Sequence, residues 1–188
     1  MMNWTEYLTK FEDVLEGKNK EYPYDNPDYL EYVKLNTSRL NRWMKKGALT
    51  DETTTVLDKV KCHQKWILIT EPWCGDAANI APIIDLMAEY SDKIEFEIEL
   101  RDDSTLIDNY LTNGGKAIPK LVARNVTGED VFVWGPRPAE CQAMVMEMKT
   151  SDLTALEKKT AIQKWYNTDK GEAIQREIRE LLDASCTL

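Results

Sequence analysis

The chain has 188 residues, of which 43% are hydrophobic and 30% are charged, and its formal net charge is −9. This composition is typical of a globular protein with one good core. The negative charge excludes nucleic acid and anionic membrane surfaces as expected partners. No apolar run approaches the roughly 18 residues needed to cross a bilayer. The start of the chain lacks the basic and apolar regions of a signal peptide, so we expect a cytoplasmic protein. Nothing in the composition decides the oligomeric state.

Residues 1–61 are predicted to be a helical extension packed on the core. Apolar residues at helical spacing predict a first helix from Trp4 to Leu15 and a second from Asp28 to Lys46. Thr50 or Asp51 can cap a third, short helix. We find no convincing strand in this part of the chain.

The central stretch runs from Lys65 to Tyr90. It opens with the apolar run 66–70, which is typical of a strand buried on both faces. Pro72 ends the strand pattern because proline has no N–H to donate to a neighbouring strand. A turn over residues 73–76 follows, and from Ala77 the apolar residues recur at helical spacing. The pattern therefore predicts a strand, a turn with a cysteine, and a helix.

The remaining elements predict a small sheet and more helices. Residues 94–100 alternate strictly and place three glutamates on one face, which favours an edge strand. A short helix is expected over 104–112, then a hairpin of strands 120–124 and 130–134, then a helix with Cys141 on its inner face. Residues 151–188 are predicted to be a C-terminal helical extension, with helices over 152–166 and 168–184. We expect the strand order 94–100, 66–70, 120–124, 130–134.

The four cysteines, Cys62, Cys74, Cys141 and Cys186, are widely spaced and form no CxxC pair. In a reducing cytosol they are expected to be free thiols. Cys141 lies on an apolar stripe, which favours a buried core thiol. The chain has a single histidine, so ordinary spacing assembles no metal site. We expect no metal and no cofactor.

The turn Trp73-Cys74-Gly75-Asp76-Ala77, with Pro82 in the following helix, resembles the active-site segment of the thioredoxin family, whose motif is WCxxC. A second match is Ala117-Ile118-Pro119, where the family has a cis-proline facing the nucleophile. The resemblance implies an α/β thioredoxin-like fold over residues 62–150, with a four-stranded mixed sheet flanked by helices. From about Asn36 the chain also resembles a bacterial subgroup of the family that has a WCGDA motif and lacks the resolving cysteine.

The resemblance implies that Cys74 is the nucleophile, and its position agrees, because a thiol in the first turn of a helix can be stabilised as a thiolate. Glu71 and Asp76 oppose this through their negative charges. Ala77 occupies the resolving position and has no sulfur. Leu68 stands where the family has a buried aspartate. Self-contained dithiol reduction is therefore not expected, and an inert Cys74 is the plain alternative.

The predicted function is thiol–disulfide exchange by the single thiol, with a disulfide- or thiol-containing protein or a small thiol as partner. The other predicted substrate-binding residues are Trp73, Gly75, Asp76, Ile118, Pro119 and Arg137. Ile118 would pair with an extended substrate, and Arg137 would offset Asp76, hold an acidic ligand, or be simply solvated. The alternative function is a non-enzymatic module that binds a protein segment in the groove at Pro119.

Overall fold

The computed structural model describes residues 1–186, in which the strands lie between a helical N-terminal part and a helical C-terminal part. Three helices precede the first strand, as predicted. In chain order the elements are α1 (Trp4–Leu15), α2 (Pro27–Lys46), α3 (Asp51–Leu57), β1 (Gln64–Thr70), α4 (Ala77–Tyr90), β2 (Ile94–Leu100), the 3-10 helix η1 (Leu106–Asn109), β3 (Lys120–Asn125), β4 (Asp130–Trp134), α5 (Ala139–Lys149), α6 (Ala155–Asp169) and α7 (Glu172–Cys186).

The four strands form one mixed sheet in the order β2-β1-β3-β4, which confirms the predicted order. β1 pairs with β2 in parallel and with β3 antiparallel, and β3 and β4 form the antiparallel hairpin. β1 lies in the interior of the sheet, and Leu68 faces Ile98 on one neighbour and Leu121 on the other. β2 is an edge strand, as its glutamates predicted. Met2 exchanges two backbone hydrogen bonds of 2.8 Å with Ile98 and covers part of that edge.

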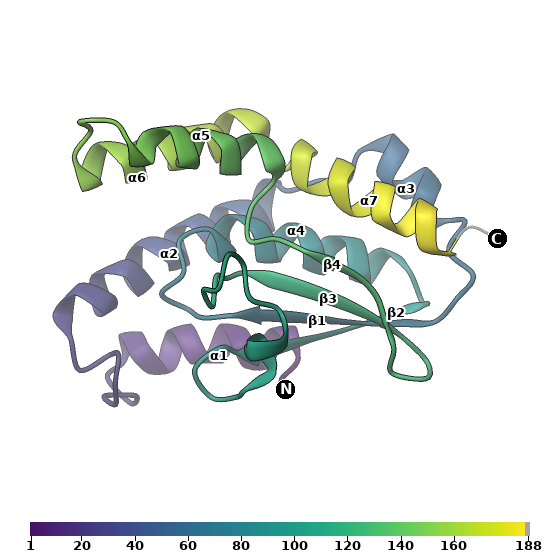
Figure 1. Ribbon diagram of the computed structural model, residues 1–188. Coiled ribbons are helices and arrows are strands. Elements are labelled where there is room, and N and C mark those ends of the chain that lie inside the picture. The colour runs from purple at the N-terminus through teal and green to yellow at the C-terminus, as the bar shows by residue number, and fades with distance from the viewer. Residues whose placement is uncertain (187–188) are drawn as a thin grey trace.

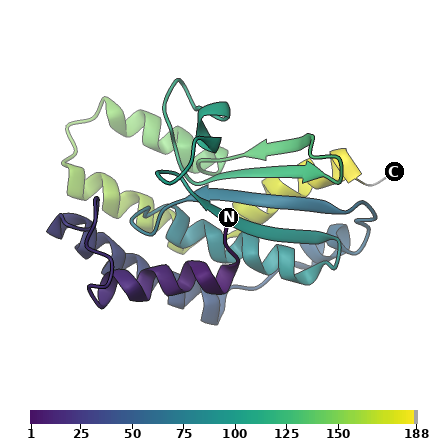
Figure 2. The ribbon, with the colours of Figure 1, turned by 90° about the horizontal axis from the view of Figure 1, so that it is seen from below.

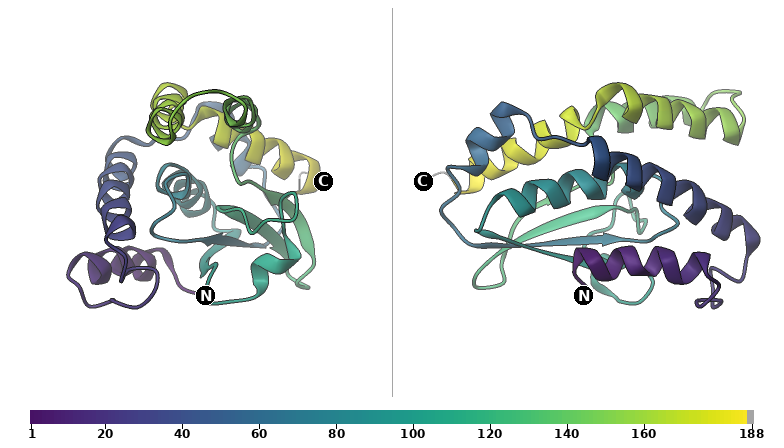
Figure 3. Two further views of the ribbon diagram at one scale, coloured as in Figure 1. Left: turned by 60° about the vertical axis from the view of Figure 1, so that its left-hand side comes forward. Right: turned by 180° about the vertical axis from the view of Figure 1, so that it is seen from behind.

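Most of the helices gather on one face of the sheet (Figure 1). α4 lies against the strands, α2 packs beside α4, α3 packs against α7, and α5 and α6 form a pair above them. The two views of Figure 3 show that α1 lies near the β2 edge and that α5 and α6 lie farthest from the sheet. The main core fills the space between the sheet and these helices. Its largest fully buried side chains include Trp66, Tyr166, Leu68, Ile83 and Ile84.

On the opposite face of the sheet, no α-helix of residues 1–186 lies in front of the strands (Figure 2). Ile67, Ile69 and Val122 form a smaller buried cluster there with Ile107 of η1. The predicted helix over 104–112 is wrong in type and length, because only the 3-10 helix η1 forms. The Ser104 hydroxyl accepts a hydrogen bond from the Leu106 N–H, and such local side-chain bonds compete with a regular helix.

The two C-terminal helices begin three to four residues later than their predicted starts. α6 begins after Thr154, whose side chain forms a capping box with Glu157. α6 ends at Asp169, and the two residues that follow, Lys170 and Gly171, have φ angles of 57° and 81° in the left-handed region. α7 therefore starts only at Glu172. None of the helices in residues 1–186 has the length and apolar character that a membrane crossing requires.

Candidate functional site

Cys74 lies in the turn that joins β1 to α4. The Cys74 N–H donates to the Glu71 carbonyl at 3.0 Å, which closes the turn, and the Ala78 N–H donates to the Cys74 carbonyl at 3.2 Å, which starts the helix. The side chain is only 6% exposed. Its thiol donates to the carbonyl of Ile118 at 3.5 Å, so the sulfur adjoins the segment before Pro119. The Ile118–Pro119 peptide bond is cis, as the family resemblance implies.

The surroundings of Cys74 favour the neutral thiol. Burial first, and then the negative charge of Asp76, raise the pKa of Cys74 to about 12. Hydrogen bonds from the backbone N–H groups of Ala77 and Asp76, and the charge of Arg137, act in the opposite direction. The helix N-terminus therefore stabilises a thiolate as expected, but burial outweighs it in this conformation.

Asp76 is tied to two elements that follow it in the chain. Arg137 Nη2 lies 2.6 Å from Asp76 Oδ2, and the Tyr166 hydroxyl donates to Asp76 Oδ1 at 2.9 Å. A second guanidinium nitrogen of Arg137 donates to Gln142 Oε1 at 3.0 Å. Of the readings left open for Arg137, this geometry matches a residue that offsets the charge of Asp76. Cys141 is fully buried, as predicted.

The loop at Gly135 packs directly behind Pro119. A Cβ at Gly135 would lie 2.5 Å from the Pro119 carbonyl oxygen, and the φ of this residue is 107°, so glycine is required here. Lys120 Nζ donates to the Gly135 carbonyl at 3.0 Å and to the Thr112 hydroxyl at 2.8 Å. These contacts hold the chain that leads to Arg137 against the Ile118–Pro119 segment.

Trp73 packs between two side chains that sequence reasoning did not identify. Tyr29 meets its ring edge-on at a centroid distance of 5.6 Å, and the Arg101 guanidinium lies 4.7 Å from its ring centroid. The ring also packs against the buried cluster that contains Cys74 and Ile118. Its Nε1 is buried and has no hydrogen-bond partner among the described residues. Trp73 thus belongs to the packing around the cluster that contains Cys74.

Helices α2 and α6 hold the active-site turn through amide side chains. Asn36 Nδ2 donates to the Pro72 carbonyl, and Asn79 Nδ2 donates to the Gly75 carbonyl, both at 2.9 Å. Asn79 Oδ1 accepts from Trp43 Nε1 at 2.9 Å and from Gln163 Nε2 at 3.0 Å. We name this arrangement the turn clamp and define it as Asn36, Trp43, Asn79, Gln163 and Tyr166. The only sequence signal for it is the presence of asparagines inside helices, where their propensity is low.

Two positions lack the groups that dithiol chemistry needs. Alanine at position 77 supplies no sulfur and leucine at position 68 supplies no carboxylate, and both side chains are fully buried. A buried acid does lie nearby at Glu71, whose Oε1 accepts from the Asp102 N–H at 2.9 Å. Burial is the main reason that the pKa of Glu71 is raised to about 7.

The cysteines differ in their bonding state. Cys74 and Cys141 are free thiols. The expectation of a free thiol is wrong for Cys62, which is disulfide-bonded. That expectation depended on an assumed reducing compartment rather than on the position of the residue. The side chain of Cys186 lies outside the described part of the chain. Within residues 1–186, no group of three or more His, Cys, Asp or Glu side chains could hold a metal ion.

Comparison with known proteins agrees with this geometry. A family model described as thioredoxin matches residues 24–149, which is more than half of the chain. A Pseudomonas aeruginosa protein of unknown function has a similar structure, with a TM-score of 0.62, 14% identity, and coverage of 83% of this chain and 91% of that chain. An HIV epitope scaffold also has a similar structure, with a TM-score of 0.58, 16% identity, and coverage of 83% of this chain and 92% of that chain. A comparison with curated proteins finds no match.

Proposed function

This chain belongs to the thioredoxin family, and from that premise we propose that it is a redox protein that uses the single thiol of Cys74 for thiol–disulfide exchange. The observation that carries the proposal is the position of the sulfur. It lies in the turn directly before α4, within hydrogen-bond reach of the N–H groups of Asp76 and Ala77, and 3.5 Å from the Ile118 carbonyl oxygen. Backbone N–H groups at a helix start stabilise the thiolate that attacks a disulfide.

The proposed exchange has two steps. The Cys74 thiolate attacks one sulfur of a disulfide, forms a mixed disulfide with it, and releases the other sulfur as a thiolate that takes up a proton. A second thiol from solution then attacks the mixed disulfide, forms a new disulfide with the bound group, and returns Cys74 to its reduced state. No net oxidation occurs, because one disulfide and one thiol give another disulfide and another thiol.

An external thiol is required because Ala77 has no sulfur with which to release the bound group. The partners we propose are therefore a disulfide- or thiol-containing protein or a small thiol. The high pKa of Cys74 means that the resting thiol is protonated at neutral pH, so exchange is slow there and accelerates as the pH rises. A substrate must also displace the cover over a sulfur that is 6% exposed.

A second candidate function is supported by that same burial. The protein would then be a thioredoxin-fold module that binds an extended protein segment beside Ile118 and Pro119, with Trp73 supplying contact area. Cys74 would be an inherited thiol whose hydrogen bond to the Ile118 carbonyl helps to hold the turn. In this case Cys74→Ser would retain the binding of the protein's ligand.

The test is the reaction of the folded protein, with the disulfide of Cys62 intact, with 2-hydroxyethyl disulfide, followed by intact mass spectrometry from neutral to alkaline pH. Cys141→Ser is the matched control, because it removes the other free thiol among the described side chains. We expect a mixed disulfide in wild type and Cys141→Ser, with a rate that increases with pH, and none at this position in Cys74→Ser. Equal labelling of all three folded proteins at each pH would contradict exchange through Cys74.

A further inference from the structure

Arg39 of α2 lies beside the active-site turn, Arg42 follows it three residues later on the same helix, and neither has an acidic partner within residues 1–186. Arg39 Nη1 donates only to the neutral Oδ1 of Asn36, at 3.0 Å. Arg42 lies 5.1 Å from the ring centroid of Trp43, and its Nη2 is buried without a hydrogen-bond partner. Within residues 1–186, neither guanidinium is in an ion pair, although the chain carries a net charge of −9.

Leaving guanidinium groups half-buried and unpaired is unfavourable, because desolvation of a cation is offset only by an anion or by several hydrogen bonds. Other arginines on this protein do have acidic partners: Arg101, Arg124, Arg137 and Arg176. The two arginines on α2 therefore differ from these four in lacking an anion.

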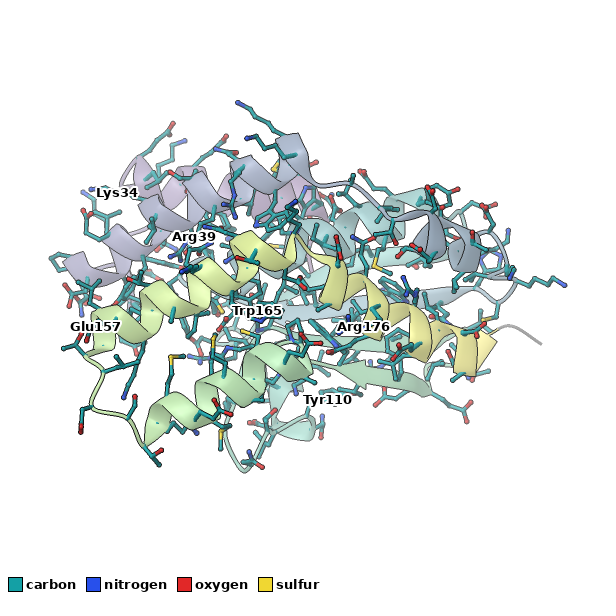
Figure 4. The ribbon with its side chains drawn as sticks, turned by 90° about the horizontal axis from the view of Figure 1, so that it is seen from above. Lys34, Arg39, Tyr110, Glu157, Trp165 and Arg176 are labelled. Carbon is teal, nitrogen blue, oxygen red and sulfur yellow. The ribbon has the colours of Figure 1, made fainter. Side chains whose placement is uncertain are left out.

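Arg39 lies directly over the turn that contains Cys74. A Cβ added at Gly75 would lie 3.0 Å from Arg39 Nη1, so the guanidinium rests on the residue that follows the thiol. Figure 4 shows Arg39 between α2 and α6, whereas Lys34 lies at the outer margin of α2. Burial lowers the pKa of Arg39, Asp76 raises it, and Arg42 lowers it again, which places these two charges close to Arg39.

The local charge balance is positive. Asp76 is the acidic group at this turn, and it is already bound by Arg137 at 2.6 Å and by the Tyr166 hydroxyl. Arg39 and Arg42 therefore add two positive charges near the single carboxylate of Asp76, and within residues 1–186 neither forms a salt bridge. Arg42 Nη2 loses no hydrogen bond if it turns toward a ligand, since it makes none now.

We propose that Arg39 and Arg42 bind a carboxylate group of the thiol or disulfide substrate that reacts at Cys74. The inference rests on the proposed exchange function and adds the substrate class, which is a small, carboxylate-bearing thiol or disulfide. The guanidinium fork matches the two oxygens of a carboxylate, and such charge-assisted hydrogen bonds are stronger than neutral ones. Repulsion by the strongly negative remainder of the protein would make this patch the entry point for an anionic substrate.

The reactivity test compares two disulfides, 3,3′-dithiodipropionate, which carries two carboxylates, and the neutral 2-hydroxyethyl disulfide. We expect wild type to form the mixed disulfide with the dicarboxylate about tenfold faster, and Arg39→Gln and Arg42→Gln to lose that preference. Lys34→Gln is the matched control, because it removes the same charge from the same helix at an exposed site. High salt should reduce the preference in wild type.

A binding test separates this inference from the exchange function. Titration of Cys74→Ser with 3,3′-thiodipropionate, which has no disulfide, is followed by calorimetry. Saturable binding that Arg39→Gln abolishes and Lys34→Gln retains supports the carboxylate site, even if no exchange occurs at Cys74. No binding in Cys74→Ser, together with equal rates for the two disulfides in folded wild type and Arg39→Gln, would overturn it. An acidic peptide that binds when thiodipropionate does not would also overturn it in favour of a protein partner.

Discussion

Glu71 offers a direct test of how burial controls the charges around the turn. Glu71 is only 4% exposed. Its carboxylate accepts a hydrogen bond from the Asp102 N–H. Burial, and to a lesser extent the charges of Asp102 and Asp103, raise its pKa from 4.5 to about 7, against the Asp102 N–H and Arg101, which lower it. The folded protein therefore holds this proton more tightly than the unfolded chain does.

The sign and size of the effect on stability follow from that difference. Between about pH 4.5 and pH 7 the folded state binds more protons than the unfolded state, so the free energy of unfolding falls as the pH rises. The interval from 4.5 to about 7 corresponds to about 3 kcal/mol, as an upper figure. Glu71→Gln keeps the acceptor oxygen for Asp102 and cannot ionise. We expect it to match wild type at acidic pH and to be more stable by up to about 3 kcal/mol at about pH 8.

The assay is urea unfolding followed by tryptophan fluorescence at several values between about pH 5 and pH 8. Asp85 is a second buried carboxyl whose pKa is raised to about 7, mainly by burial. It should contribute its own decrease in stability with pH, but that decrease is shared by both proteins and cancels in their difference. Glu31→Gln, on the exposed surface of α2, is the control. Parallel stability curves for wild type and Glu71→Gln would refute the reasoning.

Three further changes test the site. Asp76→Asn removes the charge that, after burial, most raises the pKa of Cys74, so the pH midpoint of iodoacetamide labelling should fall below that of wild type; an unchanged midpoint in a folded variant contradicts this. Ala77→Cys supplies a resolving sulfur and should raise turnover in an insulin reduction assay by about tenfold or more; equal turnover would show that wild type has another resolving group. Asn79→Ala leaves Trp43 Nε1 without its acceptor and should cost about 3 kcal/mol in urea unfolding, whereas exposed Asn41→Ala should cost little.

Local patterns were sufficient for the sheet and its order. The apolar run 66–70 predicted an interior strand, and the glutamates of 94–100 predicted an edge strand, because each pattern reflects how many faces of a strand are buried. The prediction of a helix over 104–112 was wrong because the Ser104 side chain forms a local hydrogen bond, which the spacing of apolar residues does not reveal. Boundaries of α6 and α7 depended on capping geometry at single residues.

For the site, sequence reasoning identified the residues on the turn and at Pro119, since motifs carry those positions. It did not identify the turn clamp, and it named Glu71 only as a negative charge near Cys74, not as a buried acid with a raised pKa. Asn36 and Gln163 reach the turn only after α2 and α6 have packed on either side of α4, and no local pattern encodes that approach. The sequence also did not decide whether the pKa of Cys74 is raised or lowered, because the shift depends more on how deeply the residue is buried than on which residues adjoin it.

Because of the turn clamp, the conformation of the loop that contains Cys74 depends on residues outside that loop. Asn36 lies well before the loop in the chain, and Gln163 lies well after it. A fragment of residues 62–150 would therefore keep all residues of the motif but lose both of these hydrogen-bonding side chains. Substitutions on α2 or α6 can thereby change the reactivity of Cys74 although the substituted residues make no contact with it. Two relatives with identical motifs could differ in chemistry for this reason alone, and motif-based grouping would not detect it.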